Sequence, residues 1–523
     1  MGLKIFNTLS RSLQDFVPLD AAGKKVGVYC CGPTVHDFAH IGNFRTFVFA
    51  DLVRRYLEFR GFAVTHVMNI TDVEDKIIKR VREQRTTLRE FTGKFEAEFL
   101  KDLDELRCVR PHHTPRATEY IAEMIDLIGR LLARGIAYQA ADGSIYFSIE
   151  KYRGCGCCYG QLVNLNFEGM RAGERVASDE YAKESLADFA LWKARVPEDG
   201  DVFWPSPWGE GRPGWHIECS AMSMKILGPS FDLHLGGEDL MFPHHEDEIA
   251  QSEGAGVQAG GQKFVKYWMH GAHLLVEGKK MSKSLGNFFT LRDLLAKGFT
   301  GREIRFVLLS GHYREQFNFT LESLSGARTA LARLDECLAK LRELAGETDL
   351  EDYWRTYELE LLLGPPWQWP FMDEINFRLQ SGVRTALDSD LNVSGAWGKV
   401  FDWIRETKTL FARGDMNRDC AIRALTTWRR VDQIFGLGDA PPKATTTTQT
   451  TTAAGYTVEV TTTTSTTTAP PIPGDIEEMF NSRQAARQAK DFARADAMRA
   501  ELKAKGWVIE DTPKGPRLKR IGG

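Results

Sequence analysis

The sequence predicts an α/β fold built on a parallel sheet, followed by a helical bundle and a small C-terminal domain. Three observations predict it. A strand, a helix and a strand follow one another within residues 24–70, the pattern turns mainly helical from about residue 318, and a Thr-rich tract at 444–469 precedes a last amphipathic stretch. The 523 residues are enough for several domains with sizeable cores.

The first strand–helix–strand unit follows from periodicity. "KKVGVYCCG" (24–32) is a short apolar run that ends in a glycine turn, which is typical of a strand. Residues 43–60 carry apolar side chains at helical spacing, Gly61 suits the end of that helix, and 62–70 form the next strand. Strands connected in this way are parallel, with helices on the faces of the sheet.

Later segments differ in character. Residues 116–135 and 183–193 flank a loop-rich section that contains "CGCC". The Thr-rich tract 444–469 cannot bury much apolar surface, so we interpret it as a flexible linker or insertion. Residues 476–505 form a strong amphipathic helical stretch.

Charge and composition narrow the class of protein. The net charge is −4, so any contact with nucleic acid must come from a local patch. The tail 481–523 holds 11 Lys/Arg against 5 Asp/Glu, a net +6, which indicates either an acidic partner or a solvated helix face. The sequence contains no apolar run of the length that would predict a membrane span, and its start lacks the apolar core of a secretion signal. The nine cysteines, an odd number spread over a long chain, favour a reducing, cytoplasmic location.

Two short motifs suggest a nucleotide site. "GPTVHDFAHIGN" (32–43) connects the first strand to the first helix, where backbone N–H groups and His40 can meet phosphate oxygens and Gly42 allows close approach. "GKKMSKSLGN" (278–287) describes a mobile loop whose Lys280 and Lys283 can neutralise a polyphosphate. Taken singly, the first is often a chance turn and the second an exposed charged turn.

The stretch "FPHHEDEIAQSE" (242–253) contains candidate metal ligands. If Pro243 starts a helix, His244 and Glu248 stand at i and i+4 on one face, as half of a zinc site would. His245 then points about 100° away and is better explained by packing or hydrogen bonding.

Two cysteines are candidates for the other half of that site. Cys31 follows the first strand and Cys219 lies in "GRPGWHIECSAMS" (211–223). The carboxyl ends of parallel strands meet at one edge of a sheet, so these thiols can converge there, although buried cysteines are more often structural. Cys155, Cys157 and Cys158 form a weaker C-x-C-C pattern, because no matching Cys or His pair follows them.

In this order, about 240 residues apart, the two nucleotide motifs resemble the HIGH and KMSKS signatures of class I aminoacyl-tRNA synthetases. Asn43 replaces the second His of the first signature. The chain from residue 2 to about 440, and again after the Thr-rich tract, resembles the cysteinyl-tRNA synthetases of that class. The matching stretches include "KIFNTLSR", "NITDVEDKIIKR" (69–80), "PRATEYIAEMI" (115–125), "DFALWK" (188–193), "FPHHEDEIAQSE" and "RFVLLSGHYR" (305–314).

The resemblance implies activation of L-cysteine with Mg²⁺-ATP to cysteinyl-adenylate, and its transfer to the 3′ end of tRNA(Cys). It also implies one Zn²⁺ per chain, held by Cys31, Cys219, His244 and Glu248. Zinc binds the thiolate of the substrate, which separates cysteine from nearly isosteric serine without an editing site.

Further roles come from the same resemblance, one position at a time. Thr71, Trp215 and His216 match the amino-acid pocket, and Asp239 matches an acid near the substrate amino group. The ATP site and the catalytic set match Gly32, His40, Gly42, Asn43, Lys280 and Lys283. Arg487, Phe492 and Asp496 match positions that contact anticodon bases. Without the resemblance, Trp215 and Phe492 would be read as core and Asp239 as a helix cap.

The implied architecture is a Rossmann-like parallel-sheet catalytic domain with a connective insertion, an α-helical bundle and a C-terminal anticodon-binding domain. We expect a monomer. We place the catalytic halves at 1–115 and 206–300 (with the KMSKS loop), the insertion at 116–205, a linking helical region at 301–345, the tRNA-binding bundle at 346–440, the Thr-rich linker at 441–474 and the anticodon-binding domain at 475–523.

Three other functions remain open at this point. A ligase that couples cysteine to an amino-sugar acceptor would lack the C-terminal domain that 476–523 provides. A catalytically silent tRNA-binding relative would not need both nucleotide motifs together with the zinc positions. A zinc-binding regulatory protein would leave the nucleotide motifs unexplained.

Overall fold

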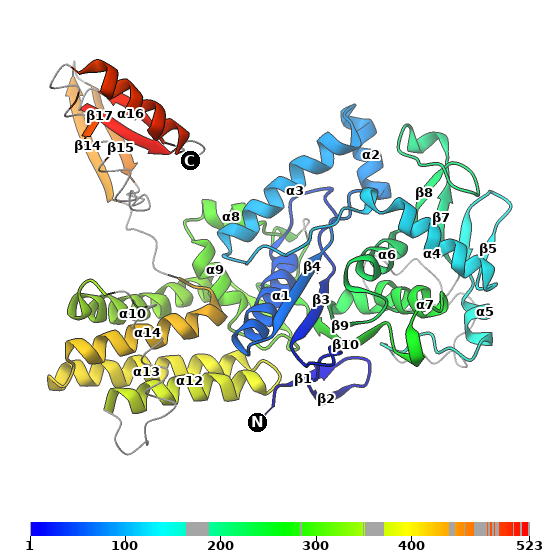
Figure 1. Cartoon of the computed structure of the whole chain (residues 1–523), viewed down its shortest axis with the longest axis horizontal. Helices are drawn as coiled ribbons and strands as arrows, with labels where there is room; N and C mark the ends of the chain where they lie inside the picture. The colour runs from blue at the N-terminus through cyan, green and yellow to red at the C-terminus, as the bar shows by residue number, and fades with distance from the viewer. Residues whose placement is uncertain are drawn as a thin grey trace. The chain divides into compact units, whose positions relative to one another are not determined.

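A computed structural model gives the architecture (Figure 1). It describes residues 2–163, 188–282, 285–348, 350, 371–438, 445–453, 456–464, 479, 482, 483, 486, 491–505, 507–512 and 515–520. The chain forms two units, Met1–Gly438 and Asp439–Gly523.

A four-stranded parallel sheet lies at the centre of the first unit. Its strands are β3 (Lys25–Cys30), β4 (Ala63–Met68), β9 (Phe231–Gly237) and β10 (Val265–Gly271), in the order β10-β9-β3-β4. Helix α1 (Ile41–Phe59) joins β3 to β4, which confirms the predicted βαβ unit and the α/β class. A small hairpin, β1 (Lys4–Asn7) with β2 (Ser12–Asp15), precedes it.

Between β4 and β9 the chain leaves the parallel sheet. Helices α2 (Asp75–Gln84), α3 (Leu88–Glu105) and α4 (Ile121–Ala133) come first. An antiparallel sheet then forms in the order β5-β6-β7-β8, and α6 leads back to β9. The remaining bounds are β5 (Ala137–Gln139), β6 (Ile145–Phe147), α5 (Ile149–Gly154), β7 (Phe189–Ala194), β8 (Gly211–Pro213) and α6 (Trp215–Leu227).

After β10 the chain forms three short strands with helices α8 and α9 between the second and the third. The three strands form a sheet in the order β12-β11-β13. From Leu321 to Phe435 the described elements are helices, as the pattern that turns helical at about residue 318 predicts. The bounds are β11 (Leu274–Val276), β12 (Lys279–Lys280), α8 (Leu291–Ala296), α9 (Gly301–Leu308), β13 (Phe317–Phe319), α10 (Leu321–Ala345), α12 (Phe371–Asp388), α13 (Val393–Arg413) and α14 (Arg418–Phe435).

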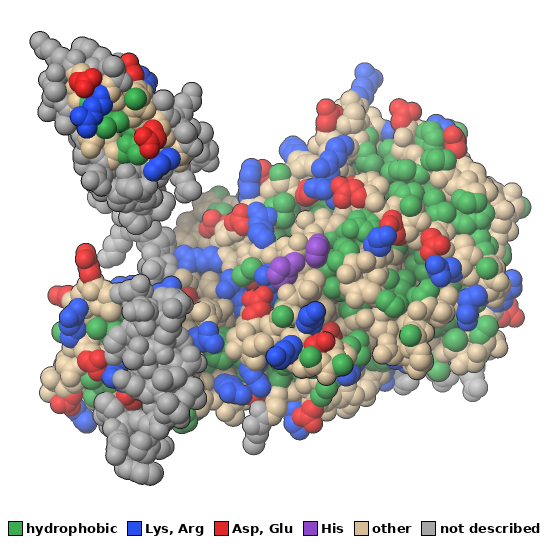
Figure 2. All heavy atoms as spheres, viewed as in Figure 1, with side chains coloured by type: hydrophobic (Ala, Val, Ile, Leu, Met, Phe, Trp, Pro, Cys, Tyr) green, Lys and Arg blue, Asp and Glu red, His purple; other side chains and the backbone are tan. Residues whose placement is uncertain are grey.

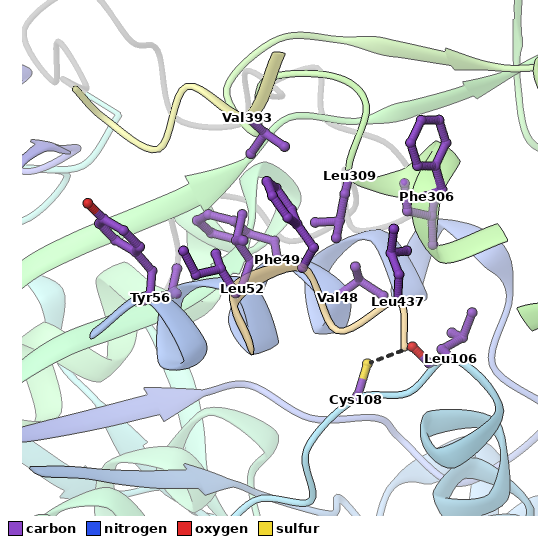
Figure 3. Close-up of a cluster of buried hydrophobic side chains, with 14 of the residues drawn as sticks. Val48, Phe49, Leu52, Tyr56, Leu106, Cys108, Phe306, Leu309, Val393 and Leu437 are labelled. Carbon is purple, nitrogen blue, oxygen red and sulfur yellow. Dashed lines mark hydrogen bonds between the residues drawn. The ribbon is translucent and has the colours of Figure 1, made fainter. Parts of the chain in front are cut away.

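One continuous apolar core joins the parallel sheet to the helical bundle. Helix α1 stands between them: Val48, Phe49, Leu52 and Tyr56 project from it into a cluster that bundle residues complete. Figure 3 shows this cluster, whose other labelled members are Leu106, Cys108, Phe306, Leu309, Val393 and Leu437. The helix that begins at the HIGN turn is therefore packed against the bundle.

A buried polar junction reinforces that contact. Asp390 lies in the turn between α12 and α13 and accepts hydrogen bonds from Phe6 N at 2.8 Å, Tyr313 Oη at 2.7 Å and Arg314 Nε at 2.7 Å. Asp390 and Leu391 both adopt positive φ, at 53° and 55°, which costs free energy for residues with a side chain. The three hydrogen bonds and the burial of both residues offset that cost.

The second unit contains β14 (Thr445–Ala453) paired with β15 (Tyr456–Thr464), and α16 (Phe492–Ala504) followed by β16 (Trp507–Thr512) and β17 (Gly515–Arg520). The hairpin β14–β15 lies within the tract that we interpret as a linker; threonine is β-branched and favours strands. Helix α16 covers the second half of the predicted helical stretch, and 476–491 lie mostly outside the described residues.

Among the residues that the structure describes, no helix is both long and apolar enough to span a membrane.

Candidate metal centre and nucleotide site

Four buried side chains meet beyond the carboxyl end of β3. Cys31 directly follows that strand, Cys219 lies in α6, and Glu248 lies in α7 (Glu246–Gly254). The Sγ atom of Cys31 is 3.9 Å from Cys219 Sγ and 3.6 Å from Glu248 Oε1. His244 Nε2 is 3.2 Å from the same Oε1. Four donors at about 2.0–2.3 Å from a tetrahedral zinc would be separated by about 3.3–3.8 Å, so this group fits zinc.

The local fold explains how His244 and Glu248 come together. The short segment η4 (Met241–His245) is interrupted at Phe242, which is extended and is joined to Pro243 by a cis peptide bond. From Pro243 the chain is helical and runs directly into α7. His244 and Glu248 then stand one turn apart, as the sequence spacing predicts. Trp215 stacks on the His244 ring, with ring centres 4.4 Å apart, and limits its orientation.

A second possible ligand group overlaps the first. It contains Cys31, His234, His245 and Glu248, again with donor atoms within 4.8 Å of one another. His245 Nε2 lies 3.3 Å from Cys31 Sγ, and its Nδ1 lies 2.8 Å from His270 Nε2. The expectation that His245 is packed and hydrogen-bonded was therefore incomplete, because one of its nitrogens also faces the thiol. The first group offers two thiols, the ligands that zinc prefers.

Burial controls the protonation of these groups in the metal-free protein. It raises the pKa of the Cys31 thiol well above its usual range, and the neighbouring Cys219 and Glu248 raise it further. A hydrogen bond with Cys31 lowers the pKa of Cys219, but burial and Glu248 outweigh it and leave that pKa raised. Burial also holds the pKa of His244 well below its usual value, so the imidazole is neutral and able to ligate.

The predicted amino-acid pocket borders this centre. Thr71 is buried and donates a hydrogen bond to Glu218 Oε2 at 3.0 Å. His216 is buried next to His244, with 2.9 Å between their Nδ1 atoms, and Trp215 is half-buried. Asp239 lies on the exposed turn η3 (Glu238–Leu240). Glu218 was not predicted from the sequence; burial raises its pKa well above the usual range.

The HIGN turn caps helix α1. His40 is the N-cap residue; its Nδ1 accepts a hydrogen bond from Asn43 N at 3.2 Å, and Asn43 Oδ1 accepts one from His40 N at 3.1 Å. A neutral His40 therefore carries its proton on Nε2, where it can donate. At Gly32 an added Cβ would overlap the carbonyl oxygen of Asn69, so only glycine fits beside that strand end.

The second signature loop lies beside the first. The backbone N–H of Ile41 donates to Phe289 O at 2.9 Å, and the Met281 side chain packs against Gly42. Lys280 is exposed on β12, and Asn287 holds the loop by bonding to Lys280 O at 3.0 Å and Ser282 N at 2.8 Å. Lys283 lies outside the described residues. On the face in Figure 2, histidine side chains reach the surface beside Lys and Arg side chains.

The remaining predicted residues lie elsewhere. Asp496 is exposed on α16, Phe492 begins that helix, and Arg487 lies outside the described residues. Cys155 and Cys158 are exposed and Cys157 is half-buried after α5. None of these three thiols belongs to a candidate metal group among the described residues.

Comparison with known proteins shows which protein families the chain matches. Residues 17–329 match the family of the class I (C) tRNA synthetase catalytic domain, and 469–516 match the cysteinyl-tRNA ligase anticodon-binding domain. The cysteine–tRNA ligase of Chlamydia pneumoniae is 42% identical over 99% of this chain and 98% of its own length.

The chain belongs to the cysteine–tRNA ligase family.

Other similarities agree with that membership. The cysteine–tRNA ligase of Protochlamydia amoebophila is 40% identical over 99% of this chain and 98% of its own length. A Mycobacterium tuberculosis methionyl-tRNA synthetase in complex with methionyl-adenylate superposes with a TM-score of 0.55 at 14% identity, covering 79% of this chain and 90% of that one. This structural likeness confirms the class I synthetase fold.

Several buried residues around the centre were not assigned a role from the sequence. His270 lies near the carboxyl end of β10, the same edge where Cys31 lies, and His234 lies in the middle of β9, paired with Tyr29 of β3. The strand-end rule that pointed to Cys31 could have pointed to His270 as well. Tyr159 and Asp247 gave no comparable signal, because the contact between them joins segments 88 residues apart.

Proposed function

We propose that this chain activates L-cysteine with ATP to give cysteinyl-adenylate and pyrophosphate, and then transfers the cysteinyl group to the 3′ end of tRNA(Cys). Membership of the cysteine–tRNA ligase family supports the reaction. The group of Cys31, Cys219, His244 and Glu248 carries the assignment of cysteine as the substrate, because two thiols, an imidazole and a carboxylate at zinc spacing fit a sulfur-recognising metal.

These four residues would hold one Zn²⁺ per chain. When bound, zinc supplies a Lewis-acidic position that takes a thiolate in preference to a hydroxyl. Thr71, Trp215 and His216 surround the position of the side chain, and Asp239 is available to the substrate ammonium group. Serine lacks the soft donor, so the site discriminates when the amino acid binds.

The nucleotide would bind at the turn that begins α1. Gly32 and Gly42 let the phosphates approach the backbone, and the helix N-terminus favours their negative charge. His40 donates from Nε2, Asn43 holds the turn, and Lys280 and Lys283 neutralise charge on the leaving pyrophosphate together with Mg²⁺. The substrate carboxylate attacks the α-phosphate, so no protein nucleophile takes part.

The tRNA would be bound by the other parts of the chain. We assign the acceptor and stem contacts to the catalytic domain and the bundle, and the anticodon contacts to Arg487, Phe492 and Asp496, with the domain limits given above. The match of 469–516 to an anticodon-binding domain supports this division of labour. We further propose a monomer in the cytoplasm, where the nine free thiols fit a reducing compartment.

Cysteine-dependent exchange of pyrophosphate into ATP tests the first step, and charging of tRNA(Cys) tests the second. We expect exchange with cysteine, none with serine, and loss of both steps after chelation with recovery on adding Zn²⁺. Absence of cysteine-dependent exchange in the zinc-loaded protein would contradict the proposal. Sedimentation at micromolar concentration tests the monomer.

A further inference from the structure

A chain of buried hydrogen-bonding groups connects the connective insertion to the candidate metal ligand His244. Tyr159 donates its hydroxyl proton to Asp247 Oδ1 at 2.5 Å. Asp247 Oδ2 lies 3.5 Å from His216 Nε2, and His216 Nδ1 lies 2.9 Å from His244 Nδ1. All four side chains are buried. We propose that Tyr159 and Asp247 are positioning residues that fix the orientation and tautomer of His216 and, through it, of the metal ligand His244.

The direction of the protons follows from the two ends. An ionised carboxylate can only accept, so Asp247 Oδ1 accepts the hydrogen bond from Tyr159, while the negative charge on Oδ2, 3.5 Å from His216 Nε2, favours a proton on that nitrogen. A neutral His216 with its proton on Nε2 accepts at Nδ1, which requires His244 to donate from its own Nδ1. The proton-free nitrogen of His244 is then Nε2, the atom that faces Glu248 Oε1 at 3.2 Å.

This arrangement lets His244 ligate a metal without first losing a proton. Ligating histidines are commonly held by an acceptor on their second nitrogen, and loss of that support weakens metal binding about 10–100-fold. Here the acceptor for His244 Nδ1 is the imidazole of His216. The Asp247 carboxylate contacts His216 and therefore acts on His244 indirectly, through that second ring. The inference rests on the proposed zinc site and deepens it.

The insertion is fixed to the same helix by a second contact. Glu246 accepts hydrogen bonds from the backbone N–H groups of Gly160 at 2.6 Å and Leu162 at 3.0 Å. These bonds hold the segment on both sides of Gln161 and leave Tyr159 directed at Asp247. Tyr159 also packs against Phe242, with ring centres 6.3 Å apart, just before the cis peptide bond that precedes His244.

Substitutions at Asp247 separate positioning from space filling. Asp247→Leu keeps the volume and removes the acceptor, whereas Asp247→Asn keeps an oxygen for His216 and turns its NH₂ toward the phenolic oxygen of Tyr159. We expect Asp247→Leu to weaken Zn²⁺ binding about 10–100-fold and Asp247→Asn to restore most of that loss. Tyr159→Phe should weaken binding by about tenfold, at the low end of that range.

The matched control is Tyr152→Phe, which removes another buried tyrosine hydroxyl from the insertion, on α5, outside this chain of contacts. The double variant Tyr159→Phe/Asp247→Asn should lose more than the sum of the single changes, because the amide then has no partner to fix its orientation.

The measurement is competition between the apo-protein and a chromophoric chelator for Zn²⁺, followed by KM for cysteine and for ATP in pyrophosphate exchange. We expect KM for cysteine to follow zinc affinity while KM for ATP stays constant. Equal losses for Asp247→Leu and Asp247→Asn, or equal effects of Tyr159→Phe and Tyr152→Phe, would overturn the inference while leaving the zinc proposal standing. A wild-type protein that binds no Zn²⁺ would overturn the proposed zinc site, and this inference with it.

Discussion

Met281 lies against Gly42, so closely that a Cβ on Gly42 would come within 2.6 Å of the Met281 methyl carbon. The two residues belong to the two nucleotide signatures, which are far apart in sequence. Their contact means that the glycine of the HIGN turn leaves space for the KMSKS loop, and we propose that it also leaves space for the nucleotide.

Gly42→Ala should therefore disturb both partners. The added methyl group would displace Met281 and press on the His40 ring, whose atoms lie 3.1 Å from the Cβ position. A misplacement of about 1 Å in reacting groups can cost about 100-fold in rate, so we expect a loss of ten- to a hundredfold in exchange. Gly93→Ala in α3, where a Cβ meets nothing within 4 Å, is the control. Equal exchange rates for Gly42→Ala and Gly93→Ala would contradict the expectation that Gly42 has to leave space for Met281 and His40.

Cys219→Ser should lower both the zinc content of the protein and its selectivity for cysteine over serine. Serine fits the same volume but offers a hard hydroxyl in place of a thiol, so zinc content should fall and preference for cysteine over serine should collapse. Metal analysis and exchange with each amino acid measure the two effects. Cys420→Ser, in α14 and away from the metal centre, should change neither.

Arg305 holds the bundle to the catalytic domain. It is fully buried, pairs with Asp51 of α1 at 2.5 Å, and donates from Nε to Phe435 O at 2.6 Å. Arg305→Met leaves the Asp51 carboxylate buried without this partner, so we expect a loss of about 3–5 kcal/mol in the free energy of unfolding.

Urea denaturation of the Arg305 variant measures that loss. The exposed pair Arg405–Asp402 provides the comparison, because Arg405→Met should cost less than about 1 kcal/mol. Similar urea midpoints for Arg305→Met and Arg405→Met would show that the buried Arg305–Asp51 pair contributes no more to stability than the exposed pair.

His66 should make the stability of the first unit depend on pH. Its ring is buried in β4, and burial, helped by Arg54, lowers its pKa to about 3. Below the unfolded pKa of about 6.5, the unfolded chain binds a proton that the native protein does not, so stability is lost as pH falls. We expect His66 to account for a loss of about 2 kcal/mol between pH 7 and 5. In denaturation at both pH values, His66→Phe should show a smaller difference than wild type; an equal difference would refute the assignment.

Asp496→Ala should affect tRNA and leave amino-acid activation unchanged. Asp496 is exposed on α16, in the part that matches an anticodon-binding domain. Loss of one contact to a base costs about 1–3 kcal/mol, so KM for tRNA(Cys) should rise about 5- to 150-fold while pyrophosphate exchange stays constant. Glu501→Ala, exposed on the same helix, is the matched control. A drop in exchange would show that Asp496 acts on the first unit.

The sequence predicted those parts of the molecule that depend on local pattern. The strand before Cys31 and the helix after the HIGN turn follow from apolar spacing, and the separation of His244 and Glu248 follows from helical geometry. The partners of Asp247 and Glu218 could not be predicted in this way. Each depends on tertiary contacts across 88 and 147 residues, and a buried carboxylate has no sequence pattern of its own. The pairing of β14 with β15 differs from the flexible-linker alternative for the Thr-rich tract and agrees with the insertion alternative. Low complexity favoured a linker because it left out the preference of β-branched threonine for strands.

One turn of α7 also limits how the protein can be rebuilt. Its first three side chains serve different parts of the chain: Glu246 binds the backbone of 160 and 162, Asp247 binds Tyr159, and Glu248 faces Cys31. A single residue inserted in that turn would rotate every later side chain by about 100°. The side chains after the insertion would then no longer face the partners they contact now. A chimera that takes the connective insertion from a relative must therefore take residues 159–162 and 246–248 as one matched set.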